Sequence, residues 1–134
     1  ANMGAANITE IEIVTTSFDK SDGGNIDVRV RFNEPVTVTG TPRVSITNGN
    51  QGSGSGRGPH LANYLSGSTT NELLFRCTIG AANSATNAGD ILVIGTNATA
   101  LNSGTIKDTG EGTVATITNS SAIGTAAGSI TVAA

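Results

Sequence analysis

The sequence predicts an all-β protein, an antiparallel β-sandwich of about seven to nine short strands. Apolar residues occupy every second position at Ile26, Val28, Val30 and Phe32, and charged residues lie between them. A period of two is typical of a strand with one buried face and one solvated face. Turn residues separate this run from several others like it, and no run has the 3.6-residue period of an amphipathic helix.

The first strands are expected in the N-terminal half of the chain. Residues 9–15 alternate, and a turn rich in aspartate and glycine follows them. The segment Ile26–Ile46 should form strand, bend, strand, turn and strand, because Glu34-Pro35 and then Gly40-Thr41-Pro42 interrupt its alternation. The tract at residues 48–59 is rich in glycine and serine and cannot contribute to a core, so we expect a long loop there.

Shorter strands are expected in the second half. In residues 72–79, the odd-numbered side chains share an apolar face, while Leu74 is an apolar residue on the opposite, outer face. Loops of small residues separate this strand from its neighbours. The remaining strands are expected at residues 61–65, 90–94, 104–107, 113–118 and 129–132.

Composition limits the size of the protein and its kinds of partner. A chain of 134 residues fits one domain with one core. Aromatic residues make up only 3%, so the core must be built from Val, Ile, Leu and Ala. Only 13% of residues are charged and the net charge is −3. Neither nucleic acid nor an anionic membrane is an expected partner, because both attract basic surfaces.

Residues that could carry catalysis have simpler structural explanations. Glu10, Glu12, Asp27 and Glu72 could supply a carboxylate pair for hydrolysis, but all four fall on outward positions of strands. A Ser-His-Asp triad would have to use His60, the one histidine, which we expect to be an exposed loop residue beside the glycine tract. We therefore expect no catalytic residues and no enzyme.

The single cysteine limits two other kinds of chemistry. With Cys77 alone, no intramolecular disulfide can form, and metal sites built from Cys and His clusters are excluded by count. Cys77 lies in an alternating strand, which indicates a small buried side chain rather than a reactive thiol.

Two glycine-bearing loops could bind ions. Asp19, Asp22 and Asp27, with the carbonyl of Asn25, offer oxygens of the kind that calcium prefers. Their spacing does not match the D-x-D-x-D-G pattern of a calcium loop, and turn formation alone explains their composition, so calcium binding stays an open alternative. The tract Gly52–Gly58 lacks the Lys-Ser or Lys-Thr of a phosphate loop and opens no helix. We expect no cofactor and no metal.

Carbohydrate chemistry has equally few candidates. Tyr64 and Phe18 are the aromatic side chains that could serve as platforms for a sugar. Asn7, Asn97 and Asn119 each begin an N-x-Ser/Thr sequon, which has meaning only if the protein enters a glycosylating compartment.

Three motifs together resemble a known family. They are F-N-E-P-V-T-V-T-G-T-P at Phe32–Pro42, A-N-Y-L-S-G-S-T-T-N-E-L-L-F at Ala62–Phe75, and A-L-N-S-G-T-I-K-D-T-G at Ala100–Gly110. In this order they look like the immunoglobulin-like modules repeated in very long bacterial surface proteins, here as a single unit of the kind also found in phage virion proteins. The resemblance covers residues 8–118 and implies an immunoglobulin-like β-sandwich that acts as a spacer or adhesive unit, without catalytic residues.

The sequence departs from that family at two positions and in its organisation. Cys77 stands where a tyrosine is more usual, and Gly110-Glu111 replaces the usual Gly-Asn. The family usually forms tandem repeats, whereas this chain holds one unit. We expect an N-terminal arm at residues 1–7, the sandwich at 8–118, and a C-terminal extension with a terminal strand at 119–134.

These observations favour a non-enzymatic structural protein. We expect a bacteriophage virion component, a capsid decoration or cement protein, because the chain has one module, begins with a small residue and shows no charged and apolar leader. Its partners would be the major capsid protein, another virion protein or its own copies, bound through termini and edge strands. Deleting residues 1–7 or 119–134 should then abolish assembly and leave the sandwich folded. The alternatives are a bacterial extracellular fibre subunit or adhesin module, and a carbohydrate-binding module.

Overall fold

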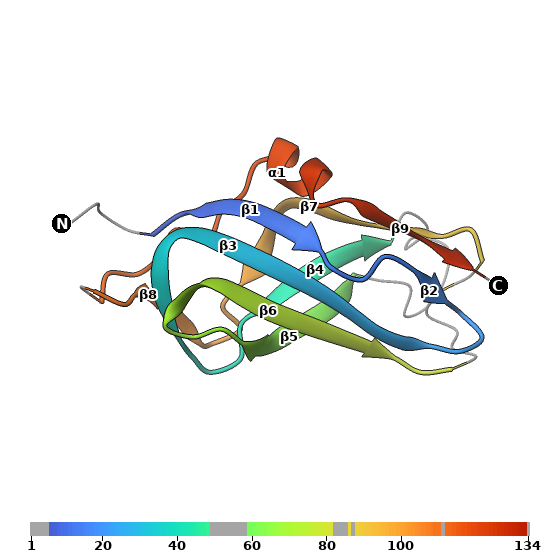
Figure 1. The fold of residues 1–134 in the computed structure, drawn as a ribbon, viewed down its shortest axis with the longest axis horizontal. Coiled ribbons are helices and arrows are strands. Elements are labelled where there is room, and N and C mark those ends of the chain that lie inside the picture. Colours follow the sequence, from blue (N-terminus) through green and yellow to red (C-terminus); the bar gives the residue numbers. More distant parts are fainter. Residues whose placement is uncertain (1–5, 49–58, 82–85, 87, 111, 134) are drawn as a thin grey trace.

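The computed structural model describes residues 6–48, 59–81, 86, 88–110 and 112–133, and in this part of the chain the prediction of an all-β protein is confirmed (Figure 1). Short turns join most of the strands. One short helix, α1 (Ser121–Ala126), accompanies them. The strands are β1 (Ile8–Ile13), β2 (Phe18–Asp19), β3 (Gly24–Thr39), β4 (Arg43–Asn48), β5 (His60–Ser66), β6 (Thr70–Ile79), β7 (Ile91–Ala100), β8 (Thr105–Asp108) and β9 (Ser129–Ala133).

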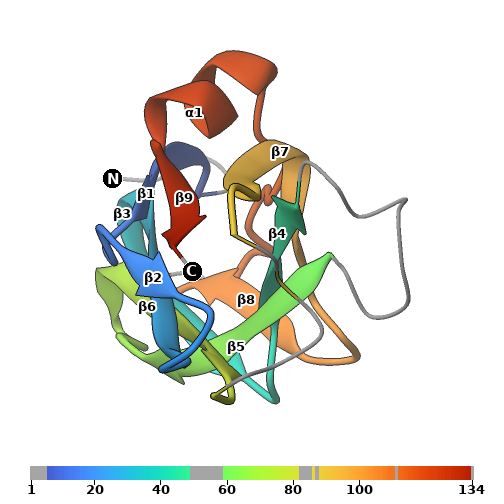
Figure 2. The same cartoon turned by 90° about the vertical axis from the view of Figure 1, so that its right-hand side faces the viewer.

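The strands form one strongly curled sheet. Hydrogen bonds join them in the order β1-β3-β6-β5-β4-β7-β9-β2, and β8 pairs with β3 outside this path. Neighbours run antiparallel, except β2 and β9, which are parallel. Seen along the longest axis, the sheet curls until its two ends approach each other (Figure 2). The predicted division into two sheets is not confirmed, because β5 pairs with both β4 and β6 and keeps the path continuous.

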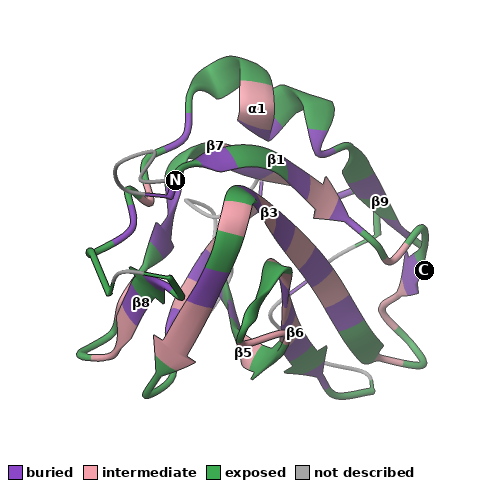
Figure 3. Ribbon diagram, turned by 60° about the vertical axis from the view of Figure 1, so that its left-hand side comes forward, coloured by how far each residue is buried: buried purple, intermediate pink, exposed green. Residues whose placement is uncertain are grey.

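The core fills the inside of this curl. In β3, Ile26, Val28 and Val30 are fully buried and Phe32 is 1% exposed. Buried and outer positions alternate along the strand, as the colouring in Figure 3 shows. The apolar face predicted from the period of two is therefore confirmed. Burying such side chains away from water is the main favourable term in folding.

Proline explains the bend in β3. Two strands were predicted on either side of Glu34-Pro35, but the structure has one strand, Gly24–Thr39, whose register against β6 shifts between Arg31 and Val36. Proline has no N–H to donate and is tolerated where a ladder is interrupted. Beyond the shift, residues 36–39 pair with β8. The interruption thus redirects the strand to a new neighbour without ending it.

The predicted strand at residues 113–118 is replaced by isolated bridges. Val114 bridges to Lys107 and Thr116 to Asn7. The Thr116 N–H also donates to the Ala6 carbonyl at 2.7 Å, and Ala6 is fully buried. Within the arm predicted at residues 1–7, Ala6 and Asn7 therefore belong to the fold, and residues 1–5 lie outside the described residues.

Helix α1 lies between β1, at one end of the sheet, and β7, two strands from the other end. It contacts β1 and β7, and just after it the Ala127 carbonyl accepts a hydrogen bond from the Ile13 N–H of β1 at 2.9 Å. The Ser120 side chain caps the helix by accepting from the Ile123 N–H at 3.3 Å. Neither α1 nor β2 was predicted. A six-residue helix shows no clear period and is too short to be stable alone, so tertiary packing must hold it.

The C-terminal residues are part of the core. Strand β9 pairs with β7 and β2, and Ile130 and Val132 are 1% and 2% exposed. The terminal strand was predicted at nearly these residues. The expectation that the fold does not need residues 119–134 is wrong, because they supply a strand and buried side chains.

Asn119 anchors this C-terminal segment to β7. It is 4% exposed, and its Oδ1 accepts from the Ala98 N–H at 2.9 Å. Its Nδ2 donates to the carbonyls of Gly95 at 2.9 Å and Ser120 at 3.0 Å, and its N–H donates to Asn97 Oδ1 at 3.1 Å. The side chain thereby satisfies backbone groups in the irregular part of β7, which the pairing with β4 leaves out of register.

Candidate functional site

The acidic residues considered for catalysis form ion pairs on the outer face of β1, β3 and β6. Asp27 accepts two hydrogen bonds from Arg76, at 2.8 and 3.0 Å. Arg31 Nε donates to Glu72 at 2.8 Å. Hydrogen bonding to these carboxylates raises the pKa of both arginines above its ordinary value. Arg29 also pairs with Glu12, and Arg31 with Glu10.

This arrangement confirms that Glu10, Glu12, Asp27 and Glu72 point outward. Opposite charges on neighbouring strands satisfy one another across the face, as cross-strand pairs do in many sheets. A general acid and base must instead converge on a reacting group. The face is suited to contact with water.

The three aspartates considered for calcium are spread over β2 (Asp19), the turn that follows it (Asp22) and β3 (Asp27). Asp19 is in β2 and its carboxylate accepts from the Ser21 N–H at 2.7 Å, whereas Asp27 is bound to Arg76. The backbone carbonyl of Asn25 accepts from the Thr15 hydroxyl at 3.3 Å, and its Oδ1 accepts from the Thr78 hydroxyl at 2.7 Å. Within the ranges that the structure describes, no group of three or more His, Cys, Asp or Glu side chains could hold a metal ion.

His60 is a buried residue, contrary to the prediction of an exposed loop residue. It is the first residue of β5 and only 6% exposed. Asn48 Nδ2 lies 3.4 Å from His60 Nε2 and donates to Asp90 Oδ2 at 3.0 Å. The pattern that could have revealed this is the alternation of β5, since His60 shares the inward phase of Ala62. Buried below the surface and bonded to one another, the three side chains form a structural polar cluster.

The side chains considered for redox chemistry and sugar binding are packed into the fold. Cys77 is 7% exposed, as predicted, and burial raises the pKa of its thiol. Phe18 is 5% exposed. The Tyr64 ring packs edge-on against Phe75 with centroids 6.1 Å apart, and its hydroxyl accepts from the Ser68 N–H at 2.9 Å. Phe18 is thus closed to a sugar, whereas Tyr64 is half-buried and its ring and hydroxyl are engaged within the fold.

The three sequons differ in their exposure. Asn119 is buried, which makes its sequon inaccessible in the folded protein, whereas Asn7 and Asn97 are exposed. The tract Gly52–Gly58 lies outside the described residues. No helix in the described part of the chain is long and apolar enough to cross a membrane.

A second surface, formed by β7, α1 and β9, is without charge. Residues 91–106 and 112–134 contain no Asp, Glu, Lys, Arg or His. The fold brings these two stretches together, because β9 pairs with β7 and α1 packs on β7. We call the outward-facing residues of these elements the uncharged surface: Ile91, Val93, Ser121, Ala122, Thr125, Ala126, Ser129 and Thr131.

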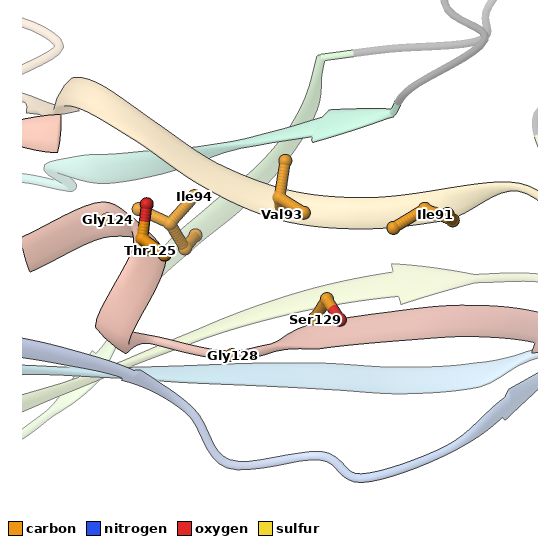
Figure 4. Close-up of a pocket in the computed structure, with 7 residues that line it drawn as sticks. All are labelled: Ile91, Val93, Ile94, Gly124, Thr125, Gly128 and Ser129. Atoms are coloured by element: carbon orange, nitrogen blue, oxygen red, sulfur yellow. The ribbon is translucent and has the colours of Figure 1, made fainter. Parts of the chain in front are cut away.

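A pocket opens on the uncharged surface between β7 and the end of α1 (Figure 4). Its volume is about 400 Å³. Helix α1 can approach β7 closely here because residue 124 is glycine. A Cβ on Gly124 would lie 2.5 Å from the Ile94 carbonyl oxygen. Ile91 stands at its edge with 48% of the residue exposed. The lining residues are Ile91, Val93, Ile94, Gly124, Thr125, Gly128 and Ser129.

The pocket can accept an apolar group and offers no side chain for acid, base or nucleophilic activation except the Thr125 and Ser129 hydroxyls. No basic residue stands near them in the lining to activate either one. The described lining therefore offers apolar contact and two hydroxyl groups. No protein-family model, curated protein or solved structure matches the chain.

Proposed function

We propose that the protein is a non-enzymatic structural protein that binds neighbouring protein subunits through the uncharged surface. The observation that carries this proposal is the pairing of an apolar pocket with an exposed isoleucine on a surface free of charge. Charged residues are depleted at the centres of protein interfaces, and apolar patches rimmed by polar residues mark interaction sites. The small hydroxyl and methyl side chains around the pocket also allow a partner to approach closely.

The distribution of charge supports an orientation within an assembly. The ion-paired face of β1, β3 and β6 is suited to water, whereas the uncharged surface on β7, α1 and β9 is suited to another subunit. A protein with two such faces fits the outer layer of a particle. Specifically, we propose that the protein is a bacteriophage virion component, a capsid decoration or cement protein.

We also propose that the protein is related to the immunoglobulin-like modules and that its curled sheet is a variant of their sandwich. The core lies between two halves of the curled sheet, β1-β3-β6 and β4-β7-β9. Two β layers that face each other across a core are also the basis of a sandwich. The three motifs that resemble bacterial immunoglobulin-like modules support it further. We regard the continuous path through β5, which joins the two halves into one sheet, as a variation on that plan.

The alternatives differ in their support. A carbohydrate-binding module has little, because Phe18 is buried and Tyr64 packs against Phe75. An extracellular fibre subunit or adhesin module would use the same uncharged surface, so location rather than surface chemistry separates it from a virion protein.

Density-gradient fractionation of cells that produce the protein, followed by mass spectrometry, tests this proposal. We expect the protein to migrate with assembled particles, in a fixed ratio to the major capsid protein. Recovery in a secreted or cell-wall fraction would support the fibre or adhesin alternative. Recovery as a free protein, bound to no other subunit, would contradict a structural role.

A further inference from the structure

The uncharged surface carries both a protruding side chain and a hollow that could receive one. Ile91 projects from β7 at one edge of the pocket, and Ile94, Gly124 and Thr125 line its other end. Three residues along a strand span about 10 Å. A surface with a knob and a hole this close together is self-complementary, because a two-fold axis between them places each knob in the opposite hole.

The charges of the two faces also favour a second copy of this chain as the partner. Two copies carry the same net charge of −3. Contact through their charged faces would place like charges near each other, unless each acidic side chain lay opposite a basic side chain of the other copy. The uncharged surface avoids this repulsion. A charged partner would lose hydration there without gaining an ion pair, which is costly. A second copy presents an uncharged surface of matching chemistry.

We propose that the uncharged surface binds a second copy of this chain, in a two-fold dimer in which Ile91 of each copy enters the pocket of the other. This inference rests on the proposed function, since it names the subunit that covers that surface. Gly128 and Ser129, which line the pocket at the start of β9, are small and leave room for the incoming side chain.

The size of the surface predicts a weak dimer. A ten-residue strand is about 33 Å long, and β7 with its neighbours β9 and α1 is about 15 Å wide. The contact is then about 500 Å² for each copy, or about 1,000 Å² in total, which lies at the lower limit for a specific interface. We therefore expect a dissociation constant in the micromolar range, on the order of 10 μM.

Sedimentation equilibrium of the full chain over a concentration series that spans the micromolar range tests the inference. The apparent mass should rise from the monomer value of 13.3 kDa toward twice that value. Ile91→Glu places a carboxylate in each pocket and should weaken the dimer by about tenfold or more. Thr125→Glu, on the opposite wall of the pocket, should do the same.

Leu65→Glu is the matched control, because Leu65 is similarly exposed at 47% but lies on β5, outside the uncharged surface. Circular dichroism should show that all three variants fold. A wild-type protein that stays monomeric, or a Leu65→Glu variant that loses the dimer as fully as Ile91→Glu, would overturn the inference. If the monomeric protein still migrates with particles, the second copy is the wrong partner and the proposed function stands. A dimer absent from every assembly would overturn the proposed function instead.

Discussion

Removal of residues 119–134 should unfold the protein. The deletion takes away β9, which pairs with both β7 and β2, and the buried side chains of Ile130 and Val132. Truncating one buried isoleucine to alanine already costs about 2–5 kcal/mol. Domains of this kind have a total stability of only about 5–15 kcal/mol, so the loss of a whole strand and its core residues exceeds or nearly equals it.

Two measurements and a graded pair of variants check this result. The truncated chain should lose its cooperative thermal transition and the dispersion of its amide resonances. Ile130→Ala should retain the fold but lose about 2–5 kcal/mol, whereas Thr131→Ala, on the exposed side of the same strand, should change stability by about 0.5 kcal/mol or less. A truncated chain that melts cooperatively with dispersed resonances would show that the C-terminal segment is an accessory to the fold.

Asn119→Ala should lower the free energy of unfolding by about 2–4 kcal/mol, because it leaves buried backbone groups without partners. The Ala98 N–H would lose its acceptor and the Gly95 carbonyl would lose a donor, both within the irregular part of β7. Water cannot easily replace these partners at a residue that is 4% exposed.

Urea unfolding with a constant m-value measures this change. Asn63→Ala is the control, since Asn63 is exposed on β5 and should change stability by about 0.5 kcal/mol or less. Equal midpoints for the two variants would mean that Asn119 does not anchor the segment.

Much of the fold could be predicted from local periodicity. Alternation placed the inward faces of β3 and β6 correctly, including Cys77, and put the acidic residues on the outer face. Periodicity reports which side of a strand is buried. It gives no information about long-range pairing, so the single curled path and the redirection of β3 toward β8 could not be predicted from it.

The residues that the sequence did not reveal depend on contacts between distant segments. Asn119 acts through the backbone of Gly95 and Ala98, and His60 is buried with Asn48 and Asp90. Asparagine and histidine are ordinary in loops, so composition alone favours exposure for them.

The uncharged surface also depends on contacts between segments that are distant in the sequence. Its two charge-free stretches are visible in the sequence at residues 91–106 and 112–134. Only the pairing of β9 with β7 brings them together around one pocket. The composition therefore reveals the two charge-free stretches, but only the strand pairing shows that they form one surface.

Hydroxyl-radical footprinting of the protein alone and in its assembly tests the central claim most directly, because it reports the exposure of individual aliphatic side chains. If the uncharged surface binds other subunits, oxidation of Ile91 and Val93 should fall on assembly, while that of Leu65 on β5 stays unchanged. Protection of Leu65 with Ile91 and Val93 still oxidised at the rate of the free protein would contradict the claim.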